Sequence, residues 1–289
     1  MNTHIKLTEL LTLERLENQL FRGQSWDLGF KALFGGQVMA QALAAAQQTV
    51  EERRKAHSFH GYFLLPGDPN IPVVYDVENI RDGRSFATRR VKGIQHGRVI
   101  FYMTASFQIE EVGMTHQYPS MPDVPGPEEL ESDLRFYERY LEKLPKHMVE
   151  KLNFHKPIDM RSVQAINPLE PSVHEPVRQV WMKASDLGSE LNMHQCALAY
   201  ASDYYFLITA VQPHGISTLN RNLRMATIDH AMWFHRPFSF GDEWLLYCME
   251  SPTAGGARGL ARGQIFNQQG ELVASTMQEG LVRQIGENS

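Results

Sequence analysis

The sequence predicts a duplicated α+β fold in which each half of the chain builds an antiparallel sheet around one buried helix. Three observations support this prediction: similar motifs recur in the two halves, each half contains a helix-length apolar run, and each half closes with two long strand-like runs around a glycine turn. A helix–helix repeat would lack the runs of period 2, and a parallel α/β domain would alternate helices with every strand.

Length and composition set the broad class. The chain has 289 residues, room for about two domains, and its 43% hydrophobic content supplies sizeable cores. The net charge of -5 argues against nucleic acid as a partner. Cys196 and Cys248 are too few for a disulfide framework and have no zinc-site spacing. No apolar stretch reaches the roughly 18 residues of a membrane span and no signal-peptide pattern is present, so we expect a cytoplasmic protein without a metal.

The first half begins its core with Phe34-Gly35-Gly36-Gln37 and an alanine-rich run over 38–46. A helix that is apolar on nearly every side must be buried, so we expect the sheet to wrap around it. Two strand-like runs over 86–95 and 98–109 follow, and His96-Gly97 is a hairpin turn signal between them.

A connector separates the halves. Its first part contains several prolines, which exclude a central strand or a helix interior: Pro119, Pro122, Pro125 and Pro127. The charged segment 128–151 then carries apolar residues at helical spacing and predicts a surface helix: Leu134, Tyr137, Tyr140, Leu141 and Leu144. We therefore expect an N-terminal half over 1–115, a connector over 116–155 and a C-terminal half over 156–289.

The second half repeats the pattern of the first. Tyr200-Ala201-Ser202-Asp203 stands 166 residues after the Phe34 motif, and the apolar run 204–211 that follows predicts a helix beginning near Asp203. Strand-like runs over 258–267 and 271–282 turn at Gln269-Gly270.

Several familiar sites have no counterpart in the sequence. G-x-S-x-G, the P-loop pattern and H-E-x-x-H are all missing, which argues against a nucleophile-elbow hydrolase, a P-loop protein and a zincin. His57 and His60 have neither a cysteine nor a carboxylate beside them, so a metal site there is disfavoured.

Asp203 is the most informative position. A carboxylate among aromatic and small residues must be paired, capping or functional, because burying it without a partner is costly. The simpler interpretation is a helix N-cap, and a cap at a buried helix start also lies beside backbone N–H groups that can hold an oxyanion. The aligned position of the first half is Gln37, so we place any reaction centre around Asp203.

Two polar residues of the second half join this candidate. Thr227 opens one strand-like run, and Gln278 shares a face with Leu272, Ala274 and Thr276, which predicts that its amide points inward. Ordinary strand polarity is the commoner explanation of a lone Thr or Gln. Further polar candidates lie nearby: Asp229, His230 and His235.

Longer motifs carry a family resemblance. They include Phe34-Gly35-Gly36-Gln37-Val38, His60-Gly61-Tyr62-Phe63, Arg81-Asp82-Gly83-Arg84-Ser85-Phe86, Tyr200-Ala201-Ser202-Asp203, Thr227-Ile228-Asp229-His230 and Gln278-Glu279-Gly280. From about residue 7 to residue 283, the chain resembles the acyl-CoA thioesterase II family. That resemblance implies a double hotdog fold, two antiparallel sheets each wrapped around a central helix in one chain. It also implies hydrolysis of fatty acyl-CoA, of medium to long chain, and assembly through sheet edges into a homodimer or homotetramer.

The resemblance further implies a catalytic trio, Asp203, Thr227 and Gln278, and each residue type matches. A thioester has a good leaving group, because a free thiol has a pKa of about 8.5, so hydrolysis needs no metal or cofactor, only an oriented water and an oxyanion site. Asp203 would accept the proton of the water that Thr227 and Gln278 hold. Candidate acyl-tunnel and CoA-phosphate residues are less specific: Phe206, Trp233 and Phe234 for the tunnel, and Arg258 or Arg262 for the phosphates.

Two alternatives stay open. A hotdog hydratase or dehydratase would use an Asp/His pair, for which Asp229 and His230 are available. A non-catalytic acyl-CoA-binding protein would keep the tunnel without needing the trio. Across the repeat His57 aligns with Thr227, so we expect it to mark a vestigial site in the first half.

Overall fold

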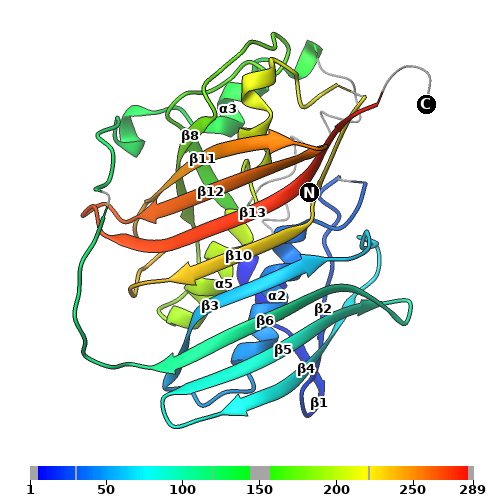
Figure 1. The fold of residues 1–289 in the computed structure, drawn as a ribbon, viewed down its shortest axis with the longest axis vertical. Helices are drawn as coiled ribbons and strands as arrows, with labels where there is room; N and C mark the ends of the chain where they lie inside the picture. The colour runs from blue at the N-terminus through cyan, green and yellow to red at the C-terminus, as the bar shows by residue number, and fades with distance from the viewer. Residues whose placement is uncertain (1–5, 30, 119, 144–156, 221, 286–289) are drawn as a thin grey trace.

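The computed structural model describes residues 6–29, 31–118, 120–143, 157–220 and 222–285 (Figure 1). The first half contains α1 (Leu7–Leu11), β1 (Glu14–Glu17), β2 (Leu20–Gly23), α2 (Gly35–Gln47), β3 (Arg54–Phe63), β4 (Val73–Asp82), β5 (Phe86–Gln95) and β6 (Arg98–Ile109). The connector contains η1 (Pro127–Glu129), α3 (Asp133–Glu138) and η2 (Leu141–Lys143). The second half contains β7 (Ile158–Ser162), β8 (Val177–Ala184), α5 (Leu191–Ser202), η3 (Leu207–Ala210), η4 (Gln212–His214), β9 (Leu223–Thr227), β10 (Asp229–Phe234), β11 (Leu245–Gly255), β12 (Arg258–Phe266) and β13 (Leu272–Gln284).

The strands form one continuous antiparallel sheet. Their order is β1-β2-β4-β5-β6-β3-β10-β13-β12-β11-β8-β7, and β9 pairs with β13 off this path. The order of the second half mirrors that of the first, and the halves meet where His60 of β3 lies opposite Ala231 of β10 (Figure 1). The two expected hotdog sheets are therefore joined edge to edge into a single sheet, with a pseudo-twofold relation at its centre.

The two long helices lie together on one face of this sheet. Every residue of α2 after Gly35 is buried, which confirms that the alanine-rich run forms a buried helix. The helix α5 packs against α2, and polar atoms meet in the contact, where Gln47 Nε2 donates to Gln195 Oε1 at 3.2 Å. Figure 1 shows both helices behind the central strands.

The predicted hairpins are confirmed. The strands β5 and β6 match the expected runs residue for residue, and the turn residues His96 and Gly97 take the positive φ values of 50° and 70° that such a turn requires. The strands β12 and β13 differ from the expected runs by one or two residues at three of their four ends. The turn at Gly270, with φ 78°, lies between them.

The connector differs from the expected single helix. Described residues form only the short elements η1, α3 and η2, and Ser132 caps α3 by accepting a hydrogen bond from Arg135 N–H at 3.4 Å. Prolines keep the stretch before η1 irregular. Pro119, Leu144 and the rest of the expected helix up to residue 151 lie outside the described residues.

The helix predicted to begin at Asp203 is wrong. Asp203 is the C-cap of α5, and the chain then turns through Tyr205, whose φ is +61°, into the short η3. Buried polar residues such as His194 and Gln195 weaken the apolar pattern of the real helix. The structural counterparts are thus α2 and α5, so the alignment of Gln37 with Asp203 is also wrong, because it matches the start of one helix with the end of the other.

Candidate active site

Asp203 lies where the C-terminus of α5 meets the N-terminus of α2. Its Oδ2 accepts a hydrogen bond from Gly36 N–H, in the first turn of α2, at 2.8 Å. A Cβ on Gly35 would stand 2.8 Å from this oxygen, and a Cβ on Gly36 would stand 2.4 Å from the carbonyl oxygen of Tyr200. The two glycines therefore allow the close approach, and Asp203 caps the helix of the other half rather than its own.

The structure brings Thr227 and Gln278 to the same carboxylate. Thr227, at the end of β9, donates through Oγ1 to Asp203 Oδ1 at 3.4 Å, and Gln278 Nε2 on β13 donates to Thr227 Oγ1 at 3.0 Å. The pairing of Thr227 with Gly280 holds β9 in place beside β13. Gln278 is fully buried, so its predicted inward orientation is confirmed.

Burial dominates the electrostatics of the cluster. Desolvation raises the pKa of Asp203 to about 6, while hydrogen bonds from Gly36 N–H, Thr227 and Gln278 oppose that rise. The titratable neighbours Tyr200, Tyr204 and Tyr247 stay neutral, because burial raises the pKa of each phenol. Asp203 is thus the charged group of the cluster at neutral pH, and its side chain keeps partial exposure.

A carboxylate of this kind suits general-base catalysis. A base works best when its pKa lies near the operating pH, since it is then ionised and still basic enough to take a proton. Partial exposure lets a water reach Asp203, and the donors from Thr227 and Gly36 fix the orientation of both oxygens. The cluster can therefore activate a water beside the positive end of α2.

Sequence reasoning missed how His230 is used. Its Nδ1 lies 2.7 Å from Gln278 Oε1, and its Nε2 lies 3.1 Å from Ser202 Oγ. Burial lowers the pKa of His230 to about 4, so the imidazole is neutral. Two features of the sequence could have indicated this role: Ser202 directly precedes Asp203, and strand alternation places His230 on the inward face of β10.

The expected alternative pair of Asp229 and His230 is not a pair. His230 points inward, whereas Asp229 Oδ1 accepts a hydrogen bond from Glu279 N–H at 2.8 Å. Successive residues of a strand face opposite sides of the sheet, so the two side chains are held apart. His235, the other histidine candidate, contacts Ser275 Oγ at 2.8 Å.

The residues expected to line an acyl tunnel or to bind the CoA phosphates lie on different faces of the sheet and do not form one site. Phe206 is buried against His230 and Tyr247, with ring centroids 5.6 and 5.5 Å apart, and Phe234 is buried. Trp233 lies 5.0 Å from His60 on the opposite face of the sheet, so its expected place in a tunnel wall is wrong. Arg258 and Arg262 are exposed and form ion pairs with carboxylates of neighbouring strands, Glu279 and Glu250.

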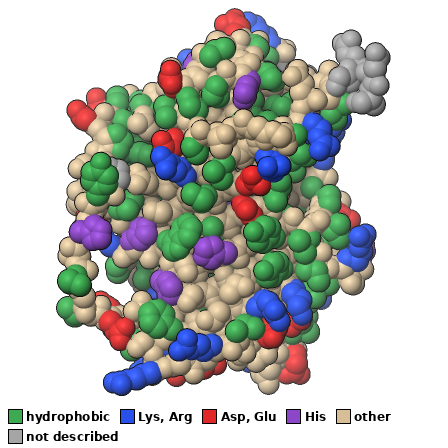
Figure 2. Space-filling model, viewed as in Figure 1, with side chains coloured by type: hydrophobic (Ala, Val, Ile, Leu, Met, Phe, Trp, Pro, Cys, Tyr) green, Lys and Arg blue, Asp and Glu red, His purple; other side chains and the backbone are tan. Residues whose placement is uncertain are grey.

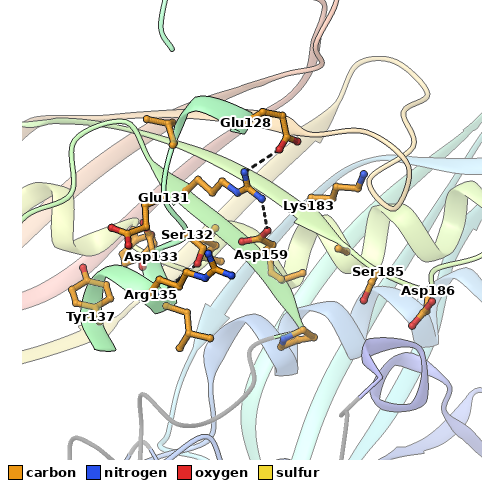
Figure 3. A pocket seen from close by; sticks show the side chains of 18 of the residues that line it. Glu128, Glu131, Ser132, Asp133, Arg135, Tyr137, Asp159, Lys183, Ser185 and Asp186 are labelled. Atoms are coloured by element: carbon orange, nitrogen blue, oxygen red, sulfur yellow. Dashed lines mark hydrogen bonds and ion pairs between the residues drawn. The ribbon is translucent and has the colours of Figure 1, made fainter. Parts of the chain in front are cut away.

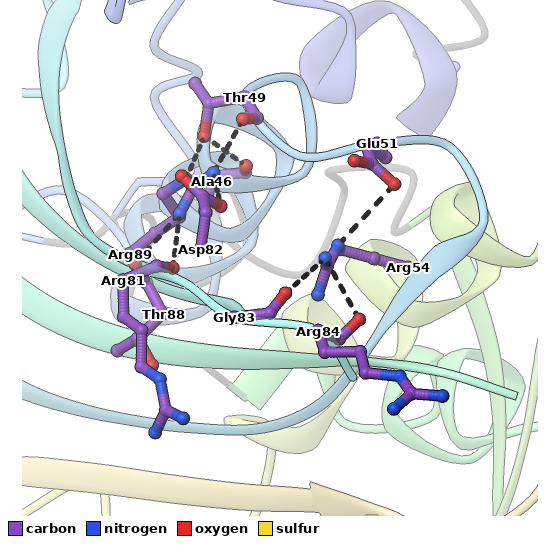
Figure 4. Close-up of polar contacts among 10 residues, drawn as sticks. All are labelled: Ala46, Thr49, Glu51, Arg54, Arg81, Asp82, Gly83, Arg84, Thr88 and Arg89. Carbon is purple, nitrogen blue, oxygen red and sulfur yellow. Dashed lines mark hydrogen bonds and ion pairs between the residues drawn. The ribbon is translucent and has the colours of Figure 1, made fainter. Parts of the chain in front are cut away.

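The first half carries a histidine contact between the strands that correspond to β10 and β13. His57 on β3 contacts Ser106 on β6 at 2.8 Å, as His230 on β10 contacts Gln278 on β13. His57 and Ser106 are partly exposed on the outer face of the sheet, where His57 meets Phe86, whereas His230 and Gln278 are buried on the inner face, so the two contacts are not equivalent. Near the end of α2, the buried guanidinium of Arg89 binds Thr49 and Asp82 instead (Figure 4).

A separate cavity of about 810 Å³ lies between the connector and the strands β7 and β8. Charged side chains surround it, and Arg161 forms ion pairs there with Glu128 and Asp159 (Figure 3). Its lining includes Tyr205 but none of Asp203, Thr227 and Gln278. The cavity is distinct from the carboxylate cluster.

The described ranges were compared with three other kinds of feature: a metal site, a disulfide and a membrane-spanning helix. No group of three or more His, Cys, Asp or Glu side chains could hold a metal ion there. Cys196 and Cys248 are both free thiols. No helix in this part of the chain is long and apolar enough to cross a membrane.

The family models and curated proteins that this chain matches are acyl-CoA thioesterases. Residues 150–281 match the acyl-CoA thioesterase family model, and residues 23–108 match the model of the acyl-CoA thioesterase N-terminal domain. Acyl-CoA thioesterase 2 of Haemophilus influenzae is 44% identical over 278 residues, covering 96% of each chain. Acyl-coenzyme A thioesterase 8 of Homo sapiens is 42% identical over 288 residues, covering 96% of this chain and 89% of its own.

Solved structures with a similar fold include another acyl-CoA thioesterase. The acyl-CoA thioesterase II TesB2 from Mycobacterium marinum superimposes with a TM-score of 0.77 at 42% identity, covering 96% of this chain and 98% of its own. A conserved protein with a hot dog fold from Alicyclobacillus acidocaldarius gives a TM-score of 0.76 at 20% identity, with coverage of 95% and 97%. The second likeness bears on the fold alone.

Proposed function

We propose that Asp203 is the general base of this enzyme, since the chain belongs to the acyl-CoA thioesterase II family and hydrolyses the thioester bond of acyl-CoA. One observation carries the assignment: a chain of hydrogen bonds runs from Gln278 through Thr227 to the partly exposed carboxylate of Asp203. Thr227 and Gln278 orient this carboxylate and the water that it activates. The expected trio thus keeps its roles in the proposal.

The reaction then proceeds in two steps. Asp203 takes a proton from the water while the water oxygen bonds to the thioester carbonyl carbon, and the carbonyl oxygen becomes an oxyanion. The carbon–sulfur bond breaks next, and the proton held by Asp203 passes to the CoA thiolate. The products are a free acid and CoA, and Asp203 returns to its ionised form.

The N-terminus of α2 is our proposed oxyanion site. Its first amides carry the positive end of the helix dipole, and one of them already reaches Asp203 from Gly36. A donor aimed at a developing oxyanion contributes about 3–4 kcal/mol to lowering the barrier. No metal or cofactor is needed in this proposal, because the thiolate leaves readily and the water needs only a base.

We propose a fatty acyl chain of medium to long length as the substrate. Aromatic side chains gather beside the carboxylate, where Phe34 lies 5.2 Å from Tyr200 and 4.6 Å from Tyr204 between ring centroids. Phe63 lies beside Gly35 at the same place. These walls suit an apolar acyl group next to the attacked carbonyl.

The division of labour between the halves is also a proposal. Residues 1–115 form the first hotdog half, 116–155 the connector, and 156–289 the half with the catalytic trio. The first half supplies the N-terminus of α2 through Gly35 and Gly36. The free thiols Cys196 and Cys248 suit the reducing conditions of the cytoplasm, where we place the enzyme.

We further propose a homodimer or homotetramer. The edge strand β1 is short and charged, and at the other edge Ser162 N–H of β7 donates to Asp133 Oδ1 at 2.8 Å, so both edges are poorly suited to pairing. On the outer face, Tyr62 and Tyr102 are exposed and stack at 6.2 Å. Figure 2 shows apolar and histidine side chains across this face. Sedimentation velocity distinguishes monomer, dimer and tetramer.

The proposed function is tested by thiol release from a panel of short- to long-chain acyl-CoAs, using wild type and Asp203→Asn in parallel. We expect the variant to lose at least about 100-fold in kcat, because a positioned general base contributes about 10²–10⁴-fold. The wild-type profile across the panel gives the chain-length preference. Normal turnover by the folded variant would show that Asp203 is not the base.

A further inference from the structure

We propose that His230 is a positioning residue, which holds the amide of Gln278 in the orientation that turns its nitrogen toward Thr227. The proposal rests on the function proposed above for Asp203 and extends the cluster beyond the trio. His230 does not touch the reacting atoms in this account. It acts through Gln278, and Ser202 acts through His230.

The direction of the hydrogen bonds starts at the carboxylate. Ionised Asp203 can only accept, so the Thr227 hydroxyl donates to it, and the Thr227 oxygen is then free to accept from Gln278 Nε2. This leaves Gln278 Oε1 facing His230. A carbonyl oxygen only accepts, so the proton on His230 must be on Nδ1, 2.7 Å away.

On its other side the imidazole meets Ser202. A neutral histidine that carries its proton on Nδ1 has an acceptor at Nε2, and Ser202 Oγ stands 3.1 Å from that atom. The one proton of the Ser202 hydroxyl is shared, because Ser202 Oγ also donates to the Ala199 carbonyl oxygen at 2.9 Å. The three bonds from His230 through Gln278 and Thr227 to Asp203 all point toward the carboxylate.

Packing keeps the imidazole from leaving this arrangement. His230, Gln278 and Ser202 are all fully buried. The ring of His230 stacks against Phe59 at 6.1 Å with an interplanar angle of 18°, and Phe206 meets it edge-on at 5.6 Å. Because burial also lowers the pKa of His230, the ring stays neutral and keeps one donor and one acceptor.

The first half supplies an internal comparison. His57 and Ser106 lie on the corresponding strands and also make a contact at 2.8 Å, but on the outer face of the sheet, where both are partly exposed. No hydrogen bond described there continues from Ser106 to a carboxylate. A histidine contact between neighbouring strands therefore does not by itself mark a site, whereas the contact of His230 continues through Gln278 and Thr227 to Asp203.

The experiment compares His230→Leu, His230→Asn and the control His57→Leu, a histidine of β3 outside the cluster, by kcat, KM and the pH dependence of kcat for a hydrolysed acyl-CoA. Leucine removes the donor to Gln278, whereas the asparagine amide can place an N–H near the position of Nδ1. We expect kcat of His230→Leu to fall about 10- to 100-fold with little change in KM, because a misplaced catalytic group costs rates of that size. The acid limb should move to higher pH, since Asp203 loses donors that lower its pKa.

The pattern across variants separates positioning from mere structure. His230→Asn should recover most of kcat and the wild-type acid limb, and His57→Leu should match wild type in both. A folded His230→Leu protein with wild-type kcat and pH profile would overturn the proposal, as would an asparagine variant no better than leucine. If Asp203→Asn also kept full turnover, the assignment of Asp203 as the base would be wrong. If Asp203→Asn were inactive while the folded His230→Leu protein behaved like wild type, only the proposed role of His230 would be wrong. Should His230→Leu not fold, Ser202→Ala takes its place, and a folded Ser202→Ala protein with wild-type kcat and an unshifted acid limb would equally overturn the proposal.

Discussion

Removing the charge of Asp203 should make the protein more stable as well as less active. Burial raises the pKa of this carboxyl from 3.8 to about 6, which means that the folded state holds the proton more tightly than the unfolded chain does. Well below pH 3.8 both states are protonated and no free energy is lost. As the pH rises from about 4 to 6 the unfolded chain ionises first, and the folded state loses stability until it ionises too.

The size of the effect follows from the shift. Because the pKa of Asp203 rises by about two and each pKa unit corresponds to about 1.4 kcal/mol, ionised Asp203 lowers the free energy of unfolding by up to about 3 kcal/mol. The partial exposure of Asp203 makes this an upper value. Asn is neutral at every pH and can still accept from Gly36 N–H. Asp203→Asn should therefore gain up to about 3 kcal/mol at pH 8, and little at pH 4. With an unfolding entropy typical of this chain length, that gain raises Tm by about 5 °C.

Urea unfolding of wild type and variant across pH 4 to 8 measures the difference. Other titrating groups are common to both proteins, so their contributions cancel, and the remaining curve belongs to Asp203. A variant that is less stable than wild type at pH 8, or a gain that does not shrink toward pH 4, would refute the account of a desolvated base.

Two further predictions concern the same cluster. The kcat of wild type should fall about tenfold per pH unit below pH 6 and level off above it, because Asp203 works only when ionised; a flat profile from pH 4 to 8 for a protein that stays folded would contradict this. Gly36→Ala should lower kcat and reduce stability by about 1–3 kcal/mol, because its Cβ would stand 2.4 Å from Tyr200 O and force α2 away from Asp203. Thermal unfolding and thiol release, with the exposed Gly97→Asn as a control at a positive φ, would show whether the loss is specific to the helix contact.

The sequence was most informative where a local pattern is enforced by burial. Alternating residues and a turn that needs positive φ defined β5 and β6 to the residue, and the alanine-rich run defined α2 as a buried helix. In the second half the same reasoning failed. Ser202 and Asp203 begin helices by propensity, yet here they end one, because tertiary contact with α2 supplies the amide that Asp203 caps.

The roles within the site were harder to predict than its members. Thr227 is 24 residues from Asp203 in the sequence, and Gln278 is 51 residues from Thr227. No local pattern could therefore show that these side chains share hydrogen bonds. His230 looked like half of an acid–base pair with Asp229, and only the alternation of β10 shows that the two point apart. The fully buried Gln278 could be placed correctly, because strand periodicity decides the face before any contact is known.

The mirrored strand order poses a final question: why does a duplicated fold have one carboxylate cluster? In a symmetric arrangement, each helix N-terminus would meet the C-terminus of the other helix, giving two equivalent places for a base. The chain uses these places differently. Where α2 begins, two glycines let its amides reach Asp203. Where α2 ends, Arg89 forms an ion pair with Asp82 and donates a hydrogen bond to Thr49. The proposed site accordingly needs both halves, because the base lies on the second and the helix N-terminus beside it lies on the first. Duplication within one chain allows each copy to keep only its own contribution, which two identical subunits could not do.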